Sequence, residues 1–295
     1  MTTKLRQSIA CIERVASLSG GRALVAFSGG KDSLVVLDLA VQVLGAKNVD
    51  TFFLYLVNGL KCVEAPINAA LARYGIERHH RVPHWELARH LREGNLCPPR
   101  GDASAIRALR AKDIEALVRK KSGVDWILNG WRKSDSFTRR IALNRSGLIW
   151  EPSRRAHPIA DWLTGDVQAY MHARKIPQPP RIGTDNPYGV SGVGLAVSQL
   201  RWLRAHAPDD WVTFCEVFPY APASLLRAEL HPDLYAEAPP KPKKPKAPRA
   251  PCGDRARRAR GRRRDNRYVD GGPVLEALER AAASRAPKTD AAAAE

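Results

Sequence analysis

Cysteine pairs are missing from this sequence. Its five cysteines form neither a Cys-Cys nor a Cys-x-x-Cys pair; they are Cys11, Cys62, Cys97, Cys215 and Cys252. We therefore expect no iron–sulfur cluster, because the sequence motifs of such clusters place several thiolates close together. The odd number of cysteines and the lack of an N-terminal apolar signal favour free thiols in a reducing cytoplasm.

Long apolar runs and metal-ligand motifs are also missing. No apolar run approaches the ~20 residues that a bilayer-spanning helix needs, so we expect no membrane partner. Four histidines lie close together in the sequence, but their spacing matches no recognised metal site, and we expect no metal ligands among them. They are His79, His80, His84 and His90.

Two common glycine-rich nucleotide motifs are absent as well. A Walker loop would need a glycine in place of Val25 and a serine or threonine in place of Asp32. The Gly-x-Gly-x-x-Gly fingerprint of dinucleotide-binding proteins does not occur at this position either. If the chain binds a nucleotide here, it does so through another kind of loop.

A compact set of phosphate-binding residue types does follow the apolar run at residues 23–27. This run predicts a buried strand, and the apolar residues 34–44 predict a buried helix. Glycine allows close approach of the backbone to an anion, a helix N-terminus offers free N–H groups, and lysine and serine add charge and donors. The alternative is a plain strand-to-helix turn. The residues in question are Ser28, Gly29, Gly30, Lys31, Asp32 and Ser33.

Strand-like and helix-like segments alternate along the first half of the chain, which predicts parallel pairing and right-handed crossovers. We expect an α/β fold with a Rossmann-like parallel sheet flanked by helices. Residues 1–235 would form one domain, with its core at about 20–180 and a helical extension at 181–235. The further expected strands are 51–57, 77–82 and 124–129, and the further expected helices are 64–74 and 106–121.

The helical extension begins with a loop rich in proline and glycine at residues 178–199. Such a long loop is either a lid or substrate channel, with Arg181 and Tyr188 facing substrate, or ordinary surface structure. Beyond it, three aromatic residues predict a second, smaller hydrophobic core, which we call the satellite core. They are Trp202, Trp211 and Phe214.

Positive charge is concentrated in a C-terminal tail. The chain carries a net charge of +18, and residues 239–268 hold 13 Lys and Arg against 2 Asp and Glu. Many prolines and few apolar residues predict that residues 236–295 are largely disordered, with a short weak helix at 274–283. The functional interpretation is contact with nucleic-acid phosphates through residues 239–268. The alternatives are a solubilising tail or a counter-charge for an acidic partner.

A second polar segment follows the expected strand 124–129. It runs from Gly130 to Ser136 and contains Arg132, with Arg139 and Arg140 close behind. Open α/β sheets bind ligands at the carboxyl ends of their strands, and guanidinium groups suit phosphate or sulfate oxygens. The alternative is a solvated basic loop. Further on, Pro-Ile-Ala-Asp-Trp at residues 158–162 leads to a helix that Thr164 can cap.

These segments together resemble a known family. Residues 28–33 resemble the pyrophosphate loop of the adenine nucleotide alpha-hydrolase-like (PP-loop ATP pyrophosphatase) superfamily. Residues 130–136 and 158–162 resemble the Gly-x-Arg-x-x-Glu-Ser and Pro-Ile-x-Asp-Trp segments of phosphoadenosine phosphosulfate (PAPS) reductase-like proteins, with Asp135 in place of glutamate. Two departures stand out. The family's Leu-Asp-Thr-Gly is Leu-Val-Asn-Gly at residues 56–59, and its Glu-Cys-Gly-(Ile/Leu)-His is matched only by Cys252-Gly253.

The resemblance implies roles for particular residues. Gly29, Gly30 and Lys31 would hold the pyrophosphate of ATP, or the equivalent anion of PAPS, while Asp32 positions Mg²⁺ or caps the helix. Arg132 and Arg139 would steady charge that develops in the transition state. We thus expect catalytic roles for Lys31, Asp32, Arg132 and Arg139, and nucleotide binding by Ser28, Gly29, Gly30, Lys31, Asp32, Ser33, Gly130 and Arg132. Contacts with substrate are expected from Glu64, Asp135, Ser136, Arg140 and Cys252.

Three functions remain open at this point. The first is an enzyme that cleaves or transfers at the α-phosphorus of an adenine nucleotide, with nucleic acid or a small molecule as acceptor. The second is thiol-dependent reduction of a sulfonucleotide, with Cys252 as nucleophile in an arginine-rich surrounding that lowers its pKa. The third is a non-catalytic protein that senses a nucleotide and binds nucleic acid.

Overall fold

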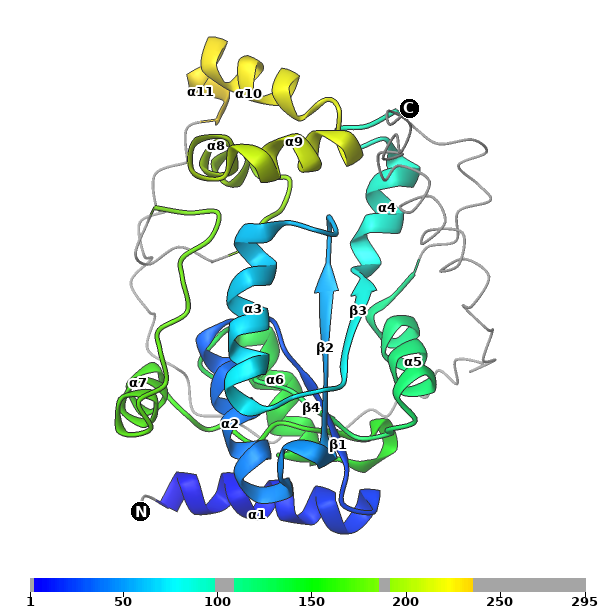
Figure 1. Ribbon diagram of the computed structural model, residues 1–295, viewed down its shortest axis with the longest axis vertical. Coiled ribbons are helices and arrows are strands. Elements are labelled where there is room, and N and C mark those ends of the chain that lie inside the picture. Colours follow the sequence, from blue (N-terminus) through cyan, green and yellow to red (C-terminus); the bar gives the residue numbers. More distant parts are fainter. Residues whose placement is uncertain (1–2, 99–108, 186–191, 236–295) are drawn as a thin grey trace, which may run out of the picture.

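The sheet is the centre of the molecule. The computed structural model describes residues 3–98, 109–185 and 192–235. The six strands have the order β3-β2-β1-β4-β6-β5 (Figure 1) and pair in parallel, except that β5 runs antiparallel to β6. The predicted parallel α/β sheet is therefore confirmed, with one reversed edge strand. The strands are β1 (Ala23–Ala26), β2 (Val49–Tyr55), β3 (His79–Pro83), β4 (Ile127–Leu128), β5 (Ile149–Trp150) and β6 (Arg155–Ala156).

Helices cover both faces of the sheet, because neighbouring residues of a strand point to opposite sides. Ala23 and Val25 of β1 pack into one core, and Leu24 between them packs into the other. The first core is closed by α1 (Thr3–Ser19), α2 (Lys31–Leu44), α3 (Lys61–Tyr74) and α7 (Thr164–Ala173). The second is closed by α4 (Trp85–Glu93) and α5 (Ala111–Ser122).

Helices of the C-terminal extension lie beyond the carboxyl ends of β2 and β3 (Figure 1). Phe214 of α9 and Leu200 of α8 are fully buried there with Val57 and Leu60, which follow β2. Trp202 and Trp211 pack against the same cluster, so the predicted satellite core is confirmed. These helices are α8 (Val197–His206), α9 (Pro208–Val217), α10 (Ala221–Leu230) and α11 (Pro232–Tyr235).

Two expected helix starts are wrong for identifiable reasons. Helix α3 starts at Lys61 rather than Glu64, because Asp210 of α9 accepts the N–H groups of Lys61 and Cys62 at 2.8 and 2.7 Å. Thr164 does not cap α7. The cap position is Leu163, whose N–H donates to Asp166 at 2.7 Å.

The remaining elements are short. They are α6 (Phe137–Ser146) and the 3₁₀ turns η1 (Ala46–Asn48) and η2 (Glu151–Ser153). None of the helices within the described ranges combines the length and apolar character that crossing a membrane requires. The predicted tail at residues 236–295, its short helix, and Tyr188 lie outside the described residues.

Candidate functional site

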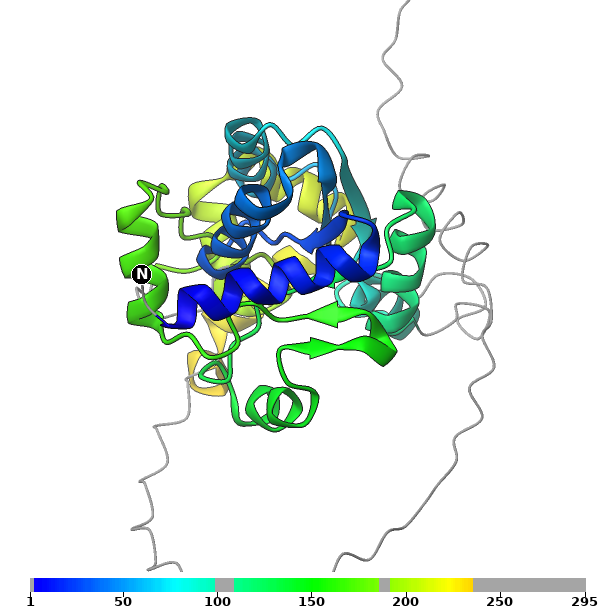
Figure 2. The ribbon, with the colours of Figure 1, turned by 90° about the horizontal axis from the view of Figure 1, so that it is seen from below.

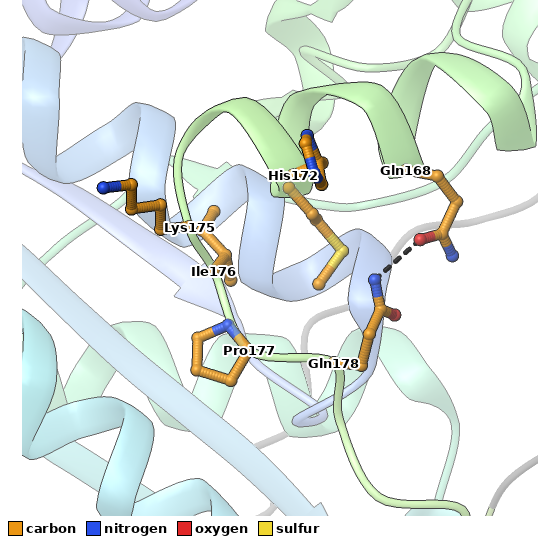
Figure 3. A pocket seen from close by; sticks show the side chains of 7 residues that line it. Gln168, His172, Lys175, Ile176, Pro177 and Gln178 are labelled. Atoms are coloured by element: carbon orange, nitrogen blue, oxygen red, sulfur yellow. Dashed lines mark hydrogen bonds between the residues drawn. The ribbon is translucent and has the colours of Figure 1, made fainter.

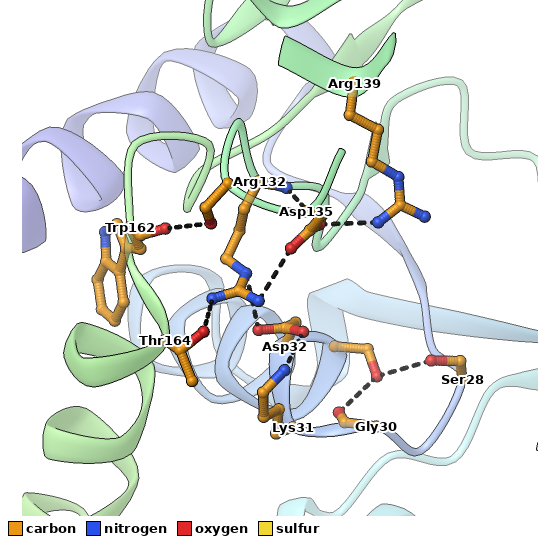
Figure 4. A network of polar contacts seen from close by, with 11 residues as sticks. Ser28, Gly30, Lys31, Asp32, Arg132, Asp135, Arg139, Trp162 and Thr164 are labelled. Atoms are coloured by element: carbon orange, nitrogen blue, oxygen red, sulfur yellow. Dashed lines mark hydrogen bonds and ion pairs between the residues drawn. The ribbon is translucent and has the colours of Figure 1, made fainter. Parts of the chain in front are cut away.

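The loop between β1 and α2 leaves the sheet at a carboxyl strand end and opens on a helix N-terminus (Figure 4). The last sheet hydrogen bond runs from the Phe27 N–H to the Phe52 carbonyl at 2.9 Å. No side chain caps the N-terminus of α2 at Gly30. The Ser33 hydroxyl instead bonds the Gly30 carbonyl at 2.9 Å and lies 3.2 Å from the Ser28 hydroxyl. The backbone N–H groups of this turn therefore have no side-chain acceptor and are suited to an anion.

Of the two glycines in the loop, Gly29 is required by the backbone and Gly30 is not. Gly29 has a φ of +73°, and a Cβ there would lie 3.0 Å from Cγ1 of Ile67. Conformation and space thus both demand glycine at this position. Gly30 has extended backbone, and a Cβ there would make an ordinary 3.6 Å contact with the Ser28 hydroxyl. The backbone itself therefore imposes no need for glycine at residue 30.

Asp32 faces two cations instead of capping the helix. Its Oδ2 lies 2.7 Å from Nζ of Lys31, and its Oδ1 lies 3.1 Å from Nε of Arg132. The expectation that Asp32 caps α2 is wrong, because this ion pairing turns both carboxylate oxygens away from the backbone N–H groups of its own helix. Lys31 remains about one-third exposed at the mouth of the loop.

Arg132 is the buried centre of this network, with a side chain only 6% exposed. One terminal nitrogen lies 2.9 Å from Oδ1 of Asp135, and the other donates to the Thr164 hydroxyl at 3.3 Å. Both terminal nitrogens thus have partners inside the protein, whereas Nε meets Oδ1 of Asp32 as an ion pair only, and neither of these two buried atoms has a hydrogen-bond partner among the described residues. This arrangement identifies Arg132 as a residue that positions Asp32 and Asp135, since a buried guanidinium needs such partners.

Gly130 lies against the first turn of α2. A Cβ at this position would lie 3.1 Å from the carbonyl carbon of Asp32 and 3.2 Å from the nitrogen of Ser33. Backbone atoms cannot move aside as side chains do. Glycine is therefore required for the close packing of the segment after β4 against the first turn of α2.

Arg139 lies at the outer end of the network, at the start of α6 (Figure 4). It donates to Oδ2 of Asp135 at 2.7 Å and lies 5.2 Å from the centre of the Trp131 ring, a cation–π distance. Trp131 in turn stacks on His157 at 5.5 Å. Burial, with the positive charges of Arg155 and Arg139, lowers the pKa of His157 to about 4, so that this ring is neutral at physiological pH.

The structure brings most of the predicted site residues together. Lys31, Asp32, Arg132, Asp135 and Arg139 form one continuous chain of ion pairs. Ser136 caps α6 by accepting the Arg139 N–H at 3.1 Å, and Arg140 donates to the Lys133 carbonyl at 3.2 Å.

Glu64 belongs to a separate set of contacts. It accepts the Gly59 N–H at 2.8 Å and pairs with Arg81 at 2.9 Å. These contacts hold together the segments that follow β2 and β3. They also explain why the first turn of α3 carries an acidic residue, so no ligand is needed to explain it.

The pKa values of three described thiols, Cys11, Cys62 and Cys215, are raised, which disfavours the thiolate form that a nucleophile needs. Burial raises the pKa of Cys11 to about 12. Burial, together with the Asp210 carboxylate, raises the pKa of Cys62 to about 12 as well, and burial also raises that of Cys215. Cys252, the expected nucleophile, lies outside the described residues.

Sequence reasoning missed two residues of the site. The Thr164 hydroxyl bonds Arg132, although we expected it to cap α7. Trp131 supports Arg139, although its only sequence signal was its place inside the Gly-x-Arg segment. Long-range partners of this kind carry no local pattern.

A cavity of about 620 Å³ opens at the C-terminal end of α7 (Figure 3). Met171, Ile176 and Pro177 supply apolar walls, and Gln168 and Gln178 are joined across its rim by a 2.7 Å hydrogen bond. None of the predicted site residues lines it. The cavity is therefore separate from the turn at residues 28–33.

Two solved structures resemble the fold. The NH3-dependent NAD synthetase from Campylobacter jejuni subsp. jejuni NCTC 11168, solved with nitrate, is 14% identical, with a TM-score of 0.43, covering 80% of this chain and 96% of that one. The U34-tRNA thiolase NcsA from Methanococcus maripaludis, solved with its [4Fe-4S] cluster, is 14% identical, with a TM-score of 0.40, covering 76% of this chain and 79% of that one. No curated protein matches the chain.

The thiolase corrects one expectation about cofactors. We expected cysteine spacing to exclude an iron–sulfur cluster, and the presence of a [4Fe-4S] cluster in NcsA shows that this exclusion is wrong. The physical reason is that cluster ligands need to be close in the folded chain, which sequence spacing does not decide. Within residues 3–98, 109–185 and 192–235, no three His, Cys, Asp or Glu side chains are grouped as metal ligands.

The family follows from a match over more than half of the sequence. Residues 22–180 match the phosphoadenosine phosphosulfate reductase domain. The match begins one residue before β1 and ends after α7, so that it contains the turn at residues 28–33, the Arg132 network and all six strands of the sheet. The chain belongs to the phosphoadenosine phosphosulfate reductase family.

Proposed function

We propose that the protein binds an adenine nucleotide at residues 28–33 and catalyses a reaction at its α-phosphorus. The observation that carries this proposal is the uncapped N-terminus of α2, reached through the left-handed Gly29 at a carboxyl strand end. In open α/β sheets this is the usual place for a ligand, and a helix N-terminus favours a phosphate. In the reaction, an acceptor atom bonds to the α-phosphorus while the bond to the bridging oxygen breaks, and pyrophosphate leaves with the electron pair.

Lys31 and Arg139 are the cations that we assign to the ligand. Each is partly exposed, at 30% and 42% of its side chain, and each is paired with a carboxylate. A phosphate group can compete for both, since cations and phosphates form strong charge-assisted hydrogen bonds. Arg132, at 6% exposure, would instead hold Asp32 and Asp135 in place while Lys31 and Arg139 turn to the ligand.

The test is nucleotide binding by a Lys31→Ala variant. Calorimetric titration with ATP and PAPS, separately, should show affinity at least tenfold weaker than that of the wild type, about 1.4 kcal/mol. Lys4→Ala is the matched control, because Lys4 is similarly exposed and also pairs with one carboxylate, that of Asp166 at 2.6 Å. Unchanged affinity in Lys31→Ala, with an unchanged circular dichroism spectrum, would refute the proposed cradle.

The products of turnover separate the reactions. Release of pyrophosphate from ATP supports chemistry at the α-phosphorus. Nucleotide binding with no pyrophosphate or sulfite released contradicts an enzyme and supports a nucleotide-sensing protein.

A second candidate is reduction of a sulfonucleotide, which the family match favours. The described thiols Cys11 and Cys62 are poor candidates, since their raised pKa keeps them protonated. Reduction would therefore depend on Cys252 and an external dithiol that supplies the two electrons. Sulfite release from PAPS that is lost in Cys252→Ser would support it; release that persists in this variant would exclude the tail thiol.

A further inference from the structure

Helix α6 presents an unusual outer face. Leu143 is its one buried residue, and the helix has three arginines and no acidic residue. At 100° per residue, the side opposite Leu143 carries Phe137, Ile141 and Arg145. Phe137 is 75% exposed and Ile141 is 54% exposed. Figure 2 shows α6, in green, at the margin of the molecule beyond the strands β5 and β6.

The inner side of α6 is joined to the phosphate-binding turn. Asp32 pairs with Arg132, Arg132 with Asp135, and Asp135 with Arg139 in the first turn of α6, at 3.1, 2.9 and 2.7 Å. A molecule bound to the outer face would thus lie on the opposite side of a helix whose first turn is joined by ion pairs to the turn that we assign to the nucleotide.

We propose that the outer face of α6 (Phe137, Ile141 and Arg145, flanked by Arg140) binds a single-stranded nucleic acid. Unpaired bases stack on aromatic side chains, and arginines contact the phosphates between them. Phe137 supplies the aromatic surface, Ile141 extends the apolar contact, and Arg145 supplies the charge one turn further along the helix. This interaction surface consists of other residues than the basic segment 239–268, which lies outside the described residues.

Other occupants fit the face less well. A second copy of this chain would bring a net charge of +18 against a basic helix, which opposes association. A lipid surface needs a broad apolar face, and α6 exposes only two large apolar side chains, Phe137 and Ile141, on ten residues. A nucleic acid matches both the charge and the exposed ring.

The test is binding of fluorescein-labelled 20-nucleotide oligo(dT) and oligo(U) to the full chain at 0.2 M salt, followed by anisotropy. We expect Phe137→Ala to weaken binding at least fivefold without changing the dependence on salt, because it removes stacking. Arg145→Ala should reduce the slope of log K against log[salt] by about 0.7, the value for one phosphate contact with a single strand.

The matched controls are on α10. Leu226 is 55% exposed, like Ile141, and Arg227 follows it. Leu226→Ala and Arg227→Ala should stay within twofold of the wild type. If they lose as much affinity as the α6 variants, or if Phe137→Ala binds like the wild type, the proposal is refuted.

Two further measurements separate the alternatives. Binding to anionic phosphatidylserine vesicles that is lost in Phe137→Ala, with oligonucleotide binding unchanged, would refute the proposal in favour of a membrane contact. The inference does not depend on the nucleotide site: Phe137→Ala should bind ATP or PAPS as the wild type does, and Lys31→Ala should bind the oligonucleotides as the wild type does. The failure of either idea can therefore be told from the failure of the other.

Discussion

Arg132 and Gly130 show how two residues far along the chain can fix the position of the turn at residues 28–33. Arg132 is enclosed by Asp32, Asp135 and Thr164, and its charge balances carboxylates that hold the first turns of α2 and α6. Gly130 allows this segment to lie on the backbone of α2. Both act on the position of the turn at residues 28–33. Removing one partner of such a buried ion pair lowers the free energy of unfolding more than removing an exposed cation does.

We predict that Gly130→Ala destabilises the protein by about 1–3 kcal/mol, the usual cost of overpacking, and weakens nucleotide binding. The added methyl group would lie 3.1–3.2 Å from backbone atoms of Asp32 and Ser33. Urea unfolding and calorimetric titration with ATP measure the two effects.

Gly165→Ala is the control, because a Cβ there has no atom within 4 Å and the residue lies in α7. It should be neutral or slightly stabilising, as alanine favours helix more than glycine does. A Gly130→Ala variant as stable as Gly165→Ala would contradict the close packing described above.

At the level of elements, α3 depends on a helix that is more than a hundred residues further along the chain. Both carboxylate oxygens of Asp210 in α9 accept N–H groups of the first turn of α3. This replaces a local cap, which Leu60 cannot supply. The extension α8–α11 is therefore joined to the sheet domain by a specific polar contact as well as by the satellite core.

Asp210→Ala should lower the free energy of unfolding by about 2 kcal/mol, the upper range for loss of a helix cap, because two N–H groups lose their acceptor. It should also lower the pKa of the Cys62 thiol, since Asp210 contributes to raising it. Urea unfolding and the pH dependence of thiol alkylation check the two effects.

Asp209→Ala is the matched control. Asp209 is 82% exposed and pairs with Lys61 at 3.4 Å, so the variant should change stability by less than about 0.5 kcal/mol. Equal effects of the two substitutions would rule out a capping role for Asp210.

On the scale of the whole molecule, stability should fall in mild acid because of buried neutral histidines. The pKa of His157 is lowered to about 4 in the folded state, chiefly by burial, and that of His79 is lowered to about 4 by burial and the charges of Arg81 and His80. Between the unfolded value of about 6.5 and the folded value, the unfolded chain binds more protons. The contribution of the neutral histidines to the free energy of unfolding is thus fully present above pH 6.5, and it declines as the pH falls towards 4.

For His157 alone, we expect the free energy of unfolding to fall by about 2 kcal/mol between pH 7.5 and pH 5. Urea unfolding at the two pH values measures it. His157→Asn removes the titrating group, and its stability should therefore depend less on pH over this interval. The same pH dependence in this variant and in the wild type would show that His157 is not the group responsible.

Local patterns were enough to predict the parallel strands β1 to β4, the turn after β1 and the satellite core, but not the short strands β5 and β6. Each predicted feature is encoded by neighbouring residues, such as an apolar run before two glycines or apolar runs that alternate with helix-like segments. The family segments at residues 130–136 and 158–162 were also recognisable from sequence. Local patterns were not enough to predict the α3 cap or the partners of Thr164, because these contacts join residues more than thirty positions apart.

The composition and motifs of this chain thus define its fold class, its family and the turn at residues 28–33. The fold alone pairs Asp32 with Arg132, brings Asp210 to the first turn of α3, and leaves Phe137 on an exposed face of α6. The physical reason is how far apart in the sequence the interacting residues lie. A strand, a turn or a helix depends on residues a few positions apart, whereas an ion pair or a cap forms between any two groups that packing brings within about 3 Å.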